Sequence, residues 1–122
     1  MRIAIISDIH GNLPALDAML ADIQTRTLDA LYCLGDLVGY APFPNEVTAR
    51  IHEMRIPTIM GNYDDGVGFD RCECGCAYRD PGERERGDRS LMWTRARVTP
   101  DNKAFLRELV KEIRVTRTGS AC

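Results

Sequence analysis

Ser7-Asp8-Ile9-His10-Gly11-Asn12 is the stretch of sequence that decides the fold of this chain. It follows an apolar run over residues 3–6 and precedes a segment with helical periodicity that opens at Leu13-Pro14. A buried strand is therefore predicted to end at Asp8 and His10, and ligands collect at the carboxyl ends of strands in an open α/β sheet. A carboxylate and an imidazole two residues apart at such an end are candidate metal ligands. The other interpretation of this stretch alone is that Asp8 caps the helix and His10 is a turn residue.

The composition limits the classes of protein to which the chain can belong. Its 122 residues are enough for one domain with a core, and 44% hydrophobic with 28% charged residues is ordinary for a globular protein. A formal net charge of −2 gives no basic field for nucleic acid or an anionic membrane. No apolar run approaches the roughly 20 residues that span a bilayer, and residues 1–6 are too short for a signal peptide. We therefore expect a cytoplasmic protein with no membrane partner.

The five cysteines do not have the pattern of a disulfide framework, because their number is odd and no signal peptide precedes them. Cys72, Cys74 and Cys76 alternate within residues 66–87, which we expect to be a charged loop. Alternate residues of an extended chain lie about 6.5–7 Å apart, which is long for a disulfide. Free thiols are the expectation for these three residues, while a structural metal or an oxidised pair remains an alternative.

Apolar periodicity and helix-capping residues predict strands that alternate with helices. The expected strands cover residues 2–7, 30–34 and 57–60, and the expected helices run from 13 to about 26, from about 45, from 81 to about 97, and from 100. The last helix has an apolar face that extends to Val110 and Ile113, although Ile113 could instead begin a further strand. His52 falls off the apolar stripe of its helix and is expected at the surface, and residues 117–122 are expected to form a flexible tail.

Each predicted strand runs into a glycine and a potential ligand, and the alternation of strands and helices favours a doubly wound parallel sheet. Right-handed crossovers place the carboxyl ends of all three strands at one edge of such a sheet. Asp8, His10, Asp36 and Asn62 are therefore expected to converge on one site, although they are far apart in the sequence.

Three motifs in this order resemble those of the calcineurin-like metallophosphoesterase superfamily: Asp8-x-His10, Gly35-Asp36-x-x-Gly39 and Gly61-Asn62. Gly61-Asn62-Tyr63-Asp64-Asp65, with Cys74-Gly75-Cys76-Ala77-Tyr78 downstream, is similar to the small prokaryotic phosphodiesterase branch of that superfamily. The resemblance runs from residue 1 to about residue 113. It implies that the parallel βαβαβ core is the first half of an α/β sandwich, here followed by C-terminal helices, in a metal-dependent phosphodiesterase or phosphatase.

The resemblance also implies a two-metal centre that hydrolyses phosphate esters. By position, Asp8 and His10 would bind the first ion, Asp36 would bridge both ions, and Asn62 would bind the second. Oxygen and imidazole ligands suit Mn, Fe, Ni or Zn, and a water held between two such ions can attack phosphorus in line. The candidate catalytic residues are Asp36, Asn62, Tyr63 and Asp64, with Asp64 expected to orient a ligand or a substrate group.

The sequence departs from the superfamily pattern in two places. Tyr63 stands where a histidine is usual, and a phenol donates a hydrogen bond but carries no positive charge at neutral pH. The other interpretation of Tyr63 is that it only packs. The second departure is larger, because His10 and His52 are the only histidines and the later Gly-His and Gly-His-x-His blocks are missing. We therefore expect a truncated member whose centre holds one metal ion or none.

Three functional hypotheses follow from these observations. The first is an enzyme that acts on a phosphoester substrate. The second is a catalytically impaired fragment that acts only as a weak metal-binding or self-associating domain, with homodimers formed through an uncovered apolar face or strand edge. The third is a binding module organised by a metal at the three alternating cysteines.

Overall fold

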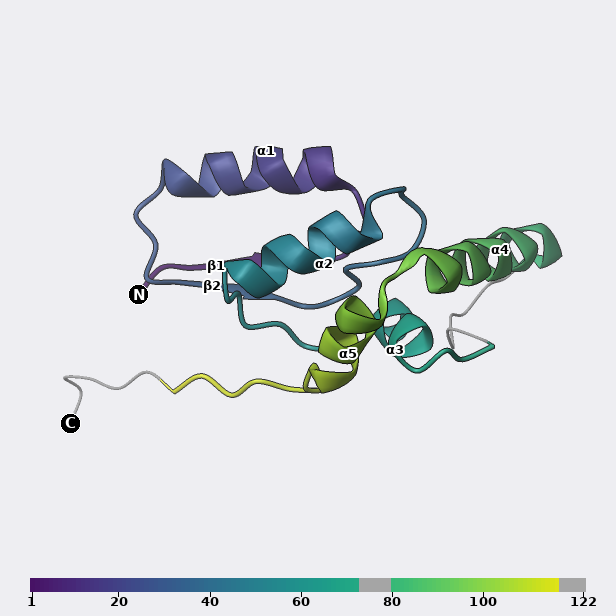
Figure 1. Cartoon of the computed structure of the whole chain (residues 1–122). Helices are drawn as coiled ribbons and strands as arrows, with labels where there is room; N and C mark the ends of the chain where they lie inside the picture. Colours follow the sequence, from purple (N-terminus) through teal and green to yellow (C-terminus); the bar gives the residue numbers. More distant parts are fainter. Residues whose placement is uncertain (73–79, 117–122) are drawn as a thin grey trace.

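The computed structural model describes residues 1–72 and 80–116, and within them it has two parallel strands and five helices (Figure 1). The elements, in chain order, are β1 (Ile3–Ile6), α1 (Leu13–Gln24), β2 (Ala30–Cys33), α2 (Pro44–Glu53), α3 (Asn62–Gly68), α4 (Pro81–Arg97) and α5 (Pro100–Glu108). The predicted α/β class with parallel strands is confirmed. None of the helices in the described ranges is long and apolar enough to cross a membrane.

The two strands are joined by α1 and pair in register, with Ile3 opposite Ala30 and Ile6 opposite Cys33. Hydrogen bonds between the chains continue past the strand ends. The Asp8 N–H donates to Gly35 O at 3.0 Å, and the His10 N–H donates to Asp36 O at 2.9 Å. The loops that follow β1 and β2 therefore remain side by side, which places their polar side chains at one edge of the sheet.

The third predicted strand, over residues 57–60, is not a strand in the structure. It is reduced to two isolated parallel bridges, one between Thr58 and Cys33 and one between Ile59 and Val110. The hydrogen bonds of a parallel ladder are present, because Ile59 N–H donates to Cys33 O and Met60 N–H donates to Val110 O. The segment is nevertheless short, since Pro57 has no N–H to donate and α3 begins at Asn62.

The helix starts expected from capping residues are confirmed. The Asn12 side chain accepts the Ala15 N–H, Asp80 accepts the Gly82 N–H and Thr99 accepts the Asn102 N–H. The expected end of the last helix was wrong. The last helix ends at Glu108, so its predicted apolar face does not reach Val110, whose carbonyl pairs with Met60.

The expected loop over residues 66–87 instead begins in α3 and ends in α4, because the short helix α3 has too little apolar periodicity to be visible in the sequence. Cys74, Cys76 and the predicted tail over residues 117–122 lie outside the described residues. Cys72 is exposed and is not in a disulfide.

The hydrophobic core lies on one side of the sheet. Ile6 of β1 packs there with residues of α1 and α2, including Leu16, Val47 and Ile51, all of which are buried. The expectation of a buried first strand was wrong for one of its faces, because Ile3 and Ile5 are 41% and 63% exposed. The continuous apolar run in the sequence shows that both faces of the strand are apolar. It does not show whether a second layer of the fold covers each face.

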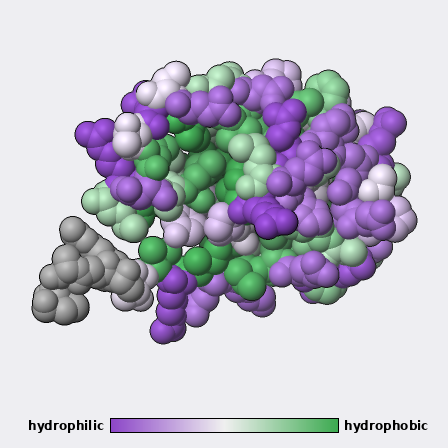
Figure 2. All heavy atoms as spheres, turned by 60° about the vertical axis from the view of Figure 1, so that its left-hand side comes forward, coloured by the Kyte–Doolittle hydropathy of each residue, from purple (hydrophilic) through white to green (hydrophobic). Residues whose placement is uncertain are grey.

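The uncovered side of the sheet forms an apolar groove of about 310 Å³. Ile3, Ile5, Tyr32 and Leu34 line it together with Ile59, residues 111–113 and Val115, and none of these residues belongs to a helix. Hydrophobic side chains gather around a hollow on the face seen in Figure 2. His52 lies at the surface as predicted, with its ring stacked on Phe105 at 4.4 Å between centroids.

Candidate metal centre

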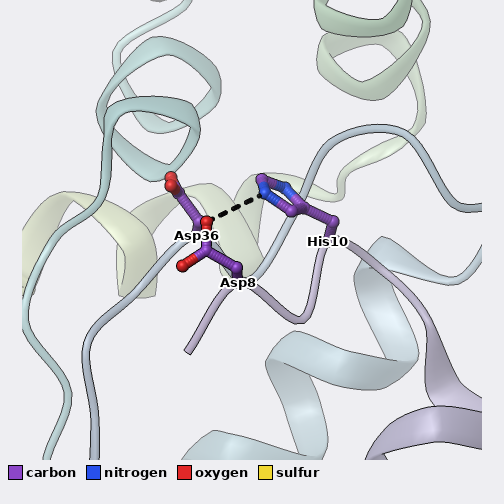
Figure 3. Close-up of side chains that lie close together, drawn as sticks. All are labelled: Asp8, His10 and Asp36. Atoms are coloured by element: carbon purple, nitrogen blue, oxygen red, sulfur yellow. Dashed lines mark ion pairs between the residues drawn. The ribbon is translucent and has the colours of Figure 1, made fainter. Parts of the chain in front are cut away.

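Asp8, His10 and Asp36 lie together at the carboxyl edge of the sheet, the first two after β1 and the third after β2 (Figure 3). One ligand atom from each of the three residues lies within 4.8 Å of the others. The His10 Nε2 is 3.3 Å from Asp8 Oδ1. Two carboxylates and an imidazole on one side of a small space form a donor set that suits a divalent first-row metal. The convergence predicted for these three residues is confirmed.

The tautomer of His10 is set by the loop after β2. The His10 Nδ1 lies 2.8 Å from the Val38 carbonyl oxygen, which can only accept a hydrogen bond. In the neutral ring, Nδ1 therefore carries the proton and the lone pair of Nε2 points toward Asp8. A metal-binding histidine in proteins is commonly oriented by such a contact at its other nitrogen.

All three candidate ligands have left-handed backbone conformations. The φ angles are 55° at Asp8, 48° at His10 and 54° at Asp36. This conformation costs a residue with a side chain about 1–2 kcal/mol relative to a right-handed one. The hydrogen bonds between the two loops maintain this conformation at Asp8, His10 and Asp36.

Comparison of Asp8→Gly with Asp8→Ala measures this strain. Both variants remove the carboxylate, but glycine adopts a positive φ without a penalty, so we expect Asp8→Gly to be the more stable by about 1 kcal/mol in urea unfolding. The matched pair is Asp17→Gly and Asp17→Ala within α1, where alanine is expected to be the more stable by about 1 kcal/mol. Equal stabilities at position 8 would show that the fold does not impose the strain.

Asp64 is buried behind the candidate ligands and connects the loops that carry them. Its carboxylate accepts three backbone N–H groups, from Asp36 at 2.7 Å, Leu37 at 2.9 Å and Gly61 at 2.9 Å. These contacts fix the position of the Asp36 loop against the start of α3. The predicted role of Asp64 in orienting a ligand or a substrate group stays a prediction, and its backbone contacts favour the first of the two.

Glycine is required where these two loops touch. A Cβ atom on Gly61 would lie 2.5 Å from the backbone nitrogen of Asp36. A Cβ atom on Gly35, where φ is 92°, would lie 2.6 Å from the nitrogen of Gly61. The glycines of the Gly-Asp and Gly-Asn motifs therefore allow the approach that brings Asp36 next to the start of α3.

Burial raises the pKa of Asp64 to about 6, although its three backbone N–H donors favour the charged form. Burial also raises the pKa of Asp36, and the neighbouring Asp8 adds to this effect, while the Tyr63 N–H and His10 oppose it. The protein by itself therefore does not fully compensate the negative charge at this edge. A bound cation would supply that compensation.

The pKa of Asp64 makes stability depend on pH. A carboxyl whose pKa rises on folding stabilises the fold below its ordinary pKa, and this contribution is lost as the pH rises through the folded value. Between about pH 3 and about pH 7, the free energy of unfolding of the metal-free protein is expected to fall by about 3 kcal/mol through Asp64. Asp36 acts in the same direction, whereas the exposed Asp70, whose pKa is lowered by Lys103, acts weakly in the opposite one.

Urea unfolding across this pH range tests the expectation. Asp64→Asn, which cannot ionise, should lose most of the pH dependence. The same slope in both proteins would contradict the assignment to Asp64.

Asn62 and Tyr63 are the first two residues of α3. The Tyr63 N–H donates to Asp36 Oδ1 at 3.0 Å, and Gly61 lies against the same carboxylate, so Asn62 belongs to a segment in contact with Asp36. Asn62 is exposed and lines a polar pocket with Arg71. Its role as a metal ligand and the catalytic role of Tyr63 stay predictions.

Tyr40 is a residue of this site that the sequence analysis missed. The Tyr63 hydroxyl donates to the Tyr40 hydroxyl at 2.7 Å, and the two rings lie edge-on to His10. The only signal in the sequence was the position of Tyr40 directly after the Gly35–Gly39 motif. That position does not show that Tyr40 meets a residue 23 positions further along the chain.

The fold and this cluster are those of an α/β protein with a candidate divalent-cation site at the carboxyl edge of a parallel sheet. The sequence model of the calcineurin-like phosphoesterase family matches residues 1–112. The chain belongs to that family. It is 38% identical over 108 residues to the "Uncharacterized protein MJ0912" of Methanocaldococcus jannaschii, which corresponds to 88% of this chain and 41% of that protein.

A similar solved structure is that of a metallophosphoesterase from Sphaerobacter thermophilus. It has a TM-score of 0.64 and 32% sequence identity, and the match covers 89% of this chain and 41% of that chain. The chain thus spans about 41% of the length of these relatives.

Proposed function

We propose that this chain carries part of the metal-binding site of a metal-dependent phosphoesterase, and that the site takes two divalent cations. The observation that supports this proposal most strongly is the convergence of Asp8, His10 and Asp36 from the ends of two strands. Membership of the calcineurin-like phosphoesterase family supports the reaction class, phosphoric ester hydrolysis.

Each residue has a specific role in this proposal. Asp8 and His10 would hold one cation, Asp36 would contribute to both and Asn62 would hold the second. The cations supply Lewis acidity toward a phosphoester. Asp64 keeps the Asp36 loop in place through its backbone contacts, and Val38 keeps the His10 Nε2 available for binding.

Metal affinity is expected to be low. Four side chains serve two ions that each take about four to six ligands, so water or added anions complete the coordination. Because the chain spans about 41% of its relatives, phosphoesterase activity is proposed for the complete site and weak metal binding for this chain.

Two measurements on the same sample test the proposal. One is calorimetric titration with Mn²⁺, and the other is the rate of hydrolysis of bis(p-nitrophenyl) phosphate. We expect saturable Mn²⁺ binding that His10→Ala weakens by more than about 10-fold and His52→Ala leaves unchanged, because His52 stacks on Phe105 away from the cluster. Hydrolysis should require the metal and His10. Absence of Mn²⁺ binding in the wild-type chain, or wild-type Mn²⁺ affinity in His10→Ala, would reject the assignment.

A second candidate function is a self-associating domain with a weak metal site, and the uncovered side of the sheet favours it. Ile5, Leu34 and Val115 are 63%, 47% and 48% exposed around the groove. Within the described ranges, β1 pairs with β2 alone and leaves one strand edge open. Open strand edges and apolar patches pair with other chains. We propose a second copy of this chain as the partner, with β1 against β1 and the two grooves merged.

Ile5→Lys tests this assembly. A charge on the apolar face and strand edge is expected to convert the dimer to monomer at concentrations where the wild type is dimeric, as measured by light scattering with sedimentation. Met92→Lys is the matched control, since Met92 is 64% exposed on α4, away from the groove, and Ile5 is 63% exposed. A monomeric wild type, or equal effects of the two substitutions, would contradict the proposed interface.

A further inference from the structure

Two tyrosine hydroxyls lie beside the candidate metal-binding imidazole. The Tyr63 hydroxyl donates to the Tyr40 hydroxyl at 2.7 Å, and the ring centroids are 5.1 Å apart. The His10 ring is edge-on to both, with centroid distances of 5.1 Å to Tyr40 and 5.4 Å to Tyr63. The three rings form one cluster, in which His10 is a candidate metal ligand.

The backbone conformation at Tyr40 and the absence of a side chain at Gly39 allow the contact between Tyr40 and Tyr63. Tyr40 has a left-handed conformation with φ of 67°, which is unfavourable for an aromatic residue. Its N–H donates to the Ser90 hydroxyl of α4 at 2.7 Å, so a helix distant in sequence holds the strained residue. Gly39 allows the Tyr63 ring to approach, because a Cβ atom there would lie 2.6 Å from the ring. Strain maintained by surrounding contacts is concentrated at functional sites.

The two hydroxyls differ in their access to a ligand. Tyr63 is only 3% exposed, whereas Tyr40 is 53% exposed. Of the two tyrosines beside His10, Tyr40 is therefore the one that a molecule from solvent can reach. The buried Tyr63 already directs its hydroxyl at Tyr40.

We propose that Tyr40 is a substrate-binding residue whose hydroxyl donates a hydrogen bond to an anionic oxygen of the phosphoester. Tyr63 is a positioning residue that acts through Tyr40. A hydroxyl that accepts one hydrogen bond becomes a better donor of another, so the chain Tyr63 to Tyr40 to phosphate strengthens the last contact. This inference rests on the proposed phosphoesterase function, and it transfers substrate contact from Tyr63, the residue that the sequence favoured, to Tyr40.

Binding of inorganic phosphate to the Mn²⁺-loaded protein tests the inference without a need for turnover. Tyr40→Phe keeps the ring against His10 and removes only the hydroxyl. Hydrogen bonds to charged groups predict a loss of about 10-fold or more in phosphate affinity, with Mn²⁺ affinity unchanged. Tyr32→Phe is the matched control, because Tyr32 lies in the apolar groove and its variant should bind phosphate as the wild type does.

Tyr63→Phe separates the two roles. We expect it to weaken phosphate binding by about 3-fold, and the double variant to bind within about 2-fold of Tyr40→Phe, because Tyr63 acts on the phosphate contact through Tyr40. Wild-type phosphate affinity in Tyr40→Phe, an equal loss of Mn²⁺ affinity in that variant, or additive effects of the two substitutions would overturn the proposal. A wild-type chain that binds Mn²⁺ but no phosphate would also overturn this inference, and it would leave the proposed metal site standing. A chain that binds no Mn²⁺ would overturn the proposed function and this inference with it.

Discussion

Asp36→Asn is expected to remove divalent-metal binding while the fold is retained. In the proposed centre, Asp36 is the ligand shared by both ions, so one substitution affects the whole site. Loss of a residue that only orients a ligand costs about 10- to 100-fold in metal affinity, so loss of the shared ligand should cost more than about 100-fold. Asparagine keeps an oxygen that can accept the Tyr63 N–H, and burial no longer opposes a charge at this position.

Mn²⁺ calorimetry and thermal unfolding of the same samples check both parts of this expectation. Asp17→Asn is the control, because it makes the same chemical change at an exposed aspartate that pairs with Arg50 in another part of the surface. The control should bind Mn²⁺ with wild-type affinity. If Asp36→Asn binds Mn²⁺ within a few-fold of the control, Asp36 is not the shared ligand.

Asp64→Ala is expected to destabilise the protein strongly. The substitution leaves three backbone N–H groups without their acceptor, that of Leu37 in a buried contact and those of Asp36 and Gly61 in partly buried contacts. Each buried donor left unsatisfied costs about 1–3 kcal/mol. Removal of the buried Asp64 charge returns part of this, so a net loss of about 3 kcal/mol is expected, which is a large part of the stability of a small domain.

Asp65→Ala provides the comparison, since Asp65 is the next residue of α3 and forms a partly exposed ion pair with Arg71. Such pairs contribute about 0–1 kcal/mol. Circular dichroism and urea unfolding should show an Asp65→Ala variant that unfolds close to the wild-type midpoint and an Asp64→Ala variant that unfolds at a much lower urea concentration. Similar stabilities of the two variants would show that water or local rearrangement satisfies the three donors.

Local signals explain which parts of the fold could be predicted. Strand ends at Asp8 and Asp36 are marked by apolar runs that stop at a glycine or a polar residue, and helix starts are marked by Asn12, Asp80 and Thr99. These signals lie within a few residues of the features that they predict. The segment over residues 57–60 was predicted less well, because its bridge to Val110 depends on a residue about 50 positions away.

The site could be predicted in part for the same reason. Parallel strands with crossover helices bring their carboxyl ends together, so the meeting of Asp8, His10 and Asp36 follows from the order of the elements. The hydroxyl contact of Tyr40 with Tyr63 could not be predicted in this way. It depends on the left-handed conformation of Tyr40, on its contact with Ser90 and on the close approach at Gly39.

The sequence by itself determined the α/β class, the strand ends that carry the candidate ligands and the family to which the chain belongs, because each depends on local periodicity or on short motifs. Only the tertiary structure decided that one side of β1 is uncovered, that Asp64 is buried beneath the loops and that Tyr40 joins the site. These features depend on which distant segments pack together and which surfaces they leave open. Such packing is a property of the whole set of contacts rather than of any stretch of the chain.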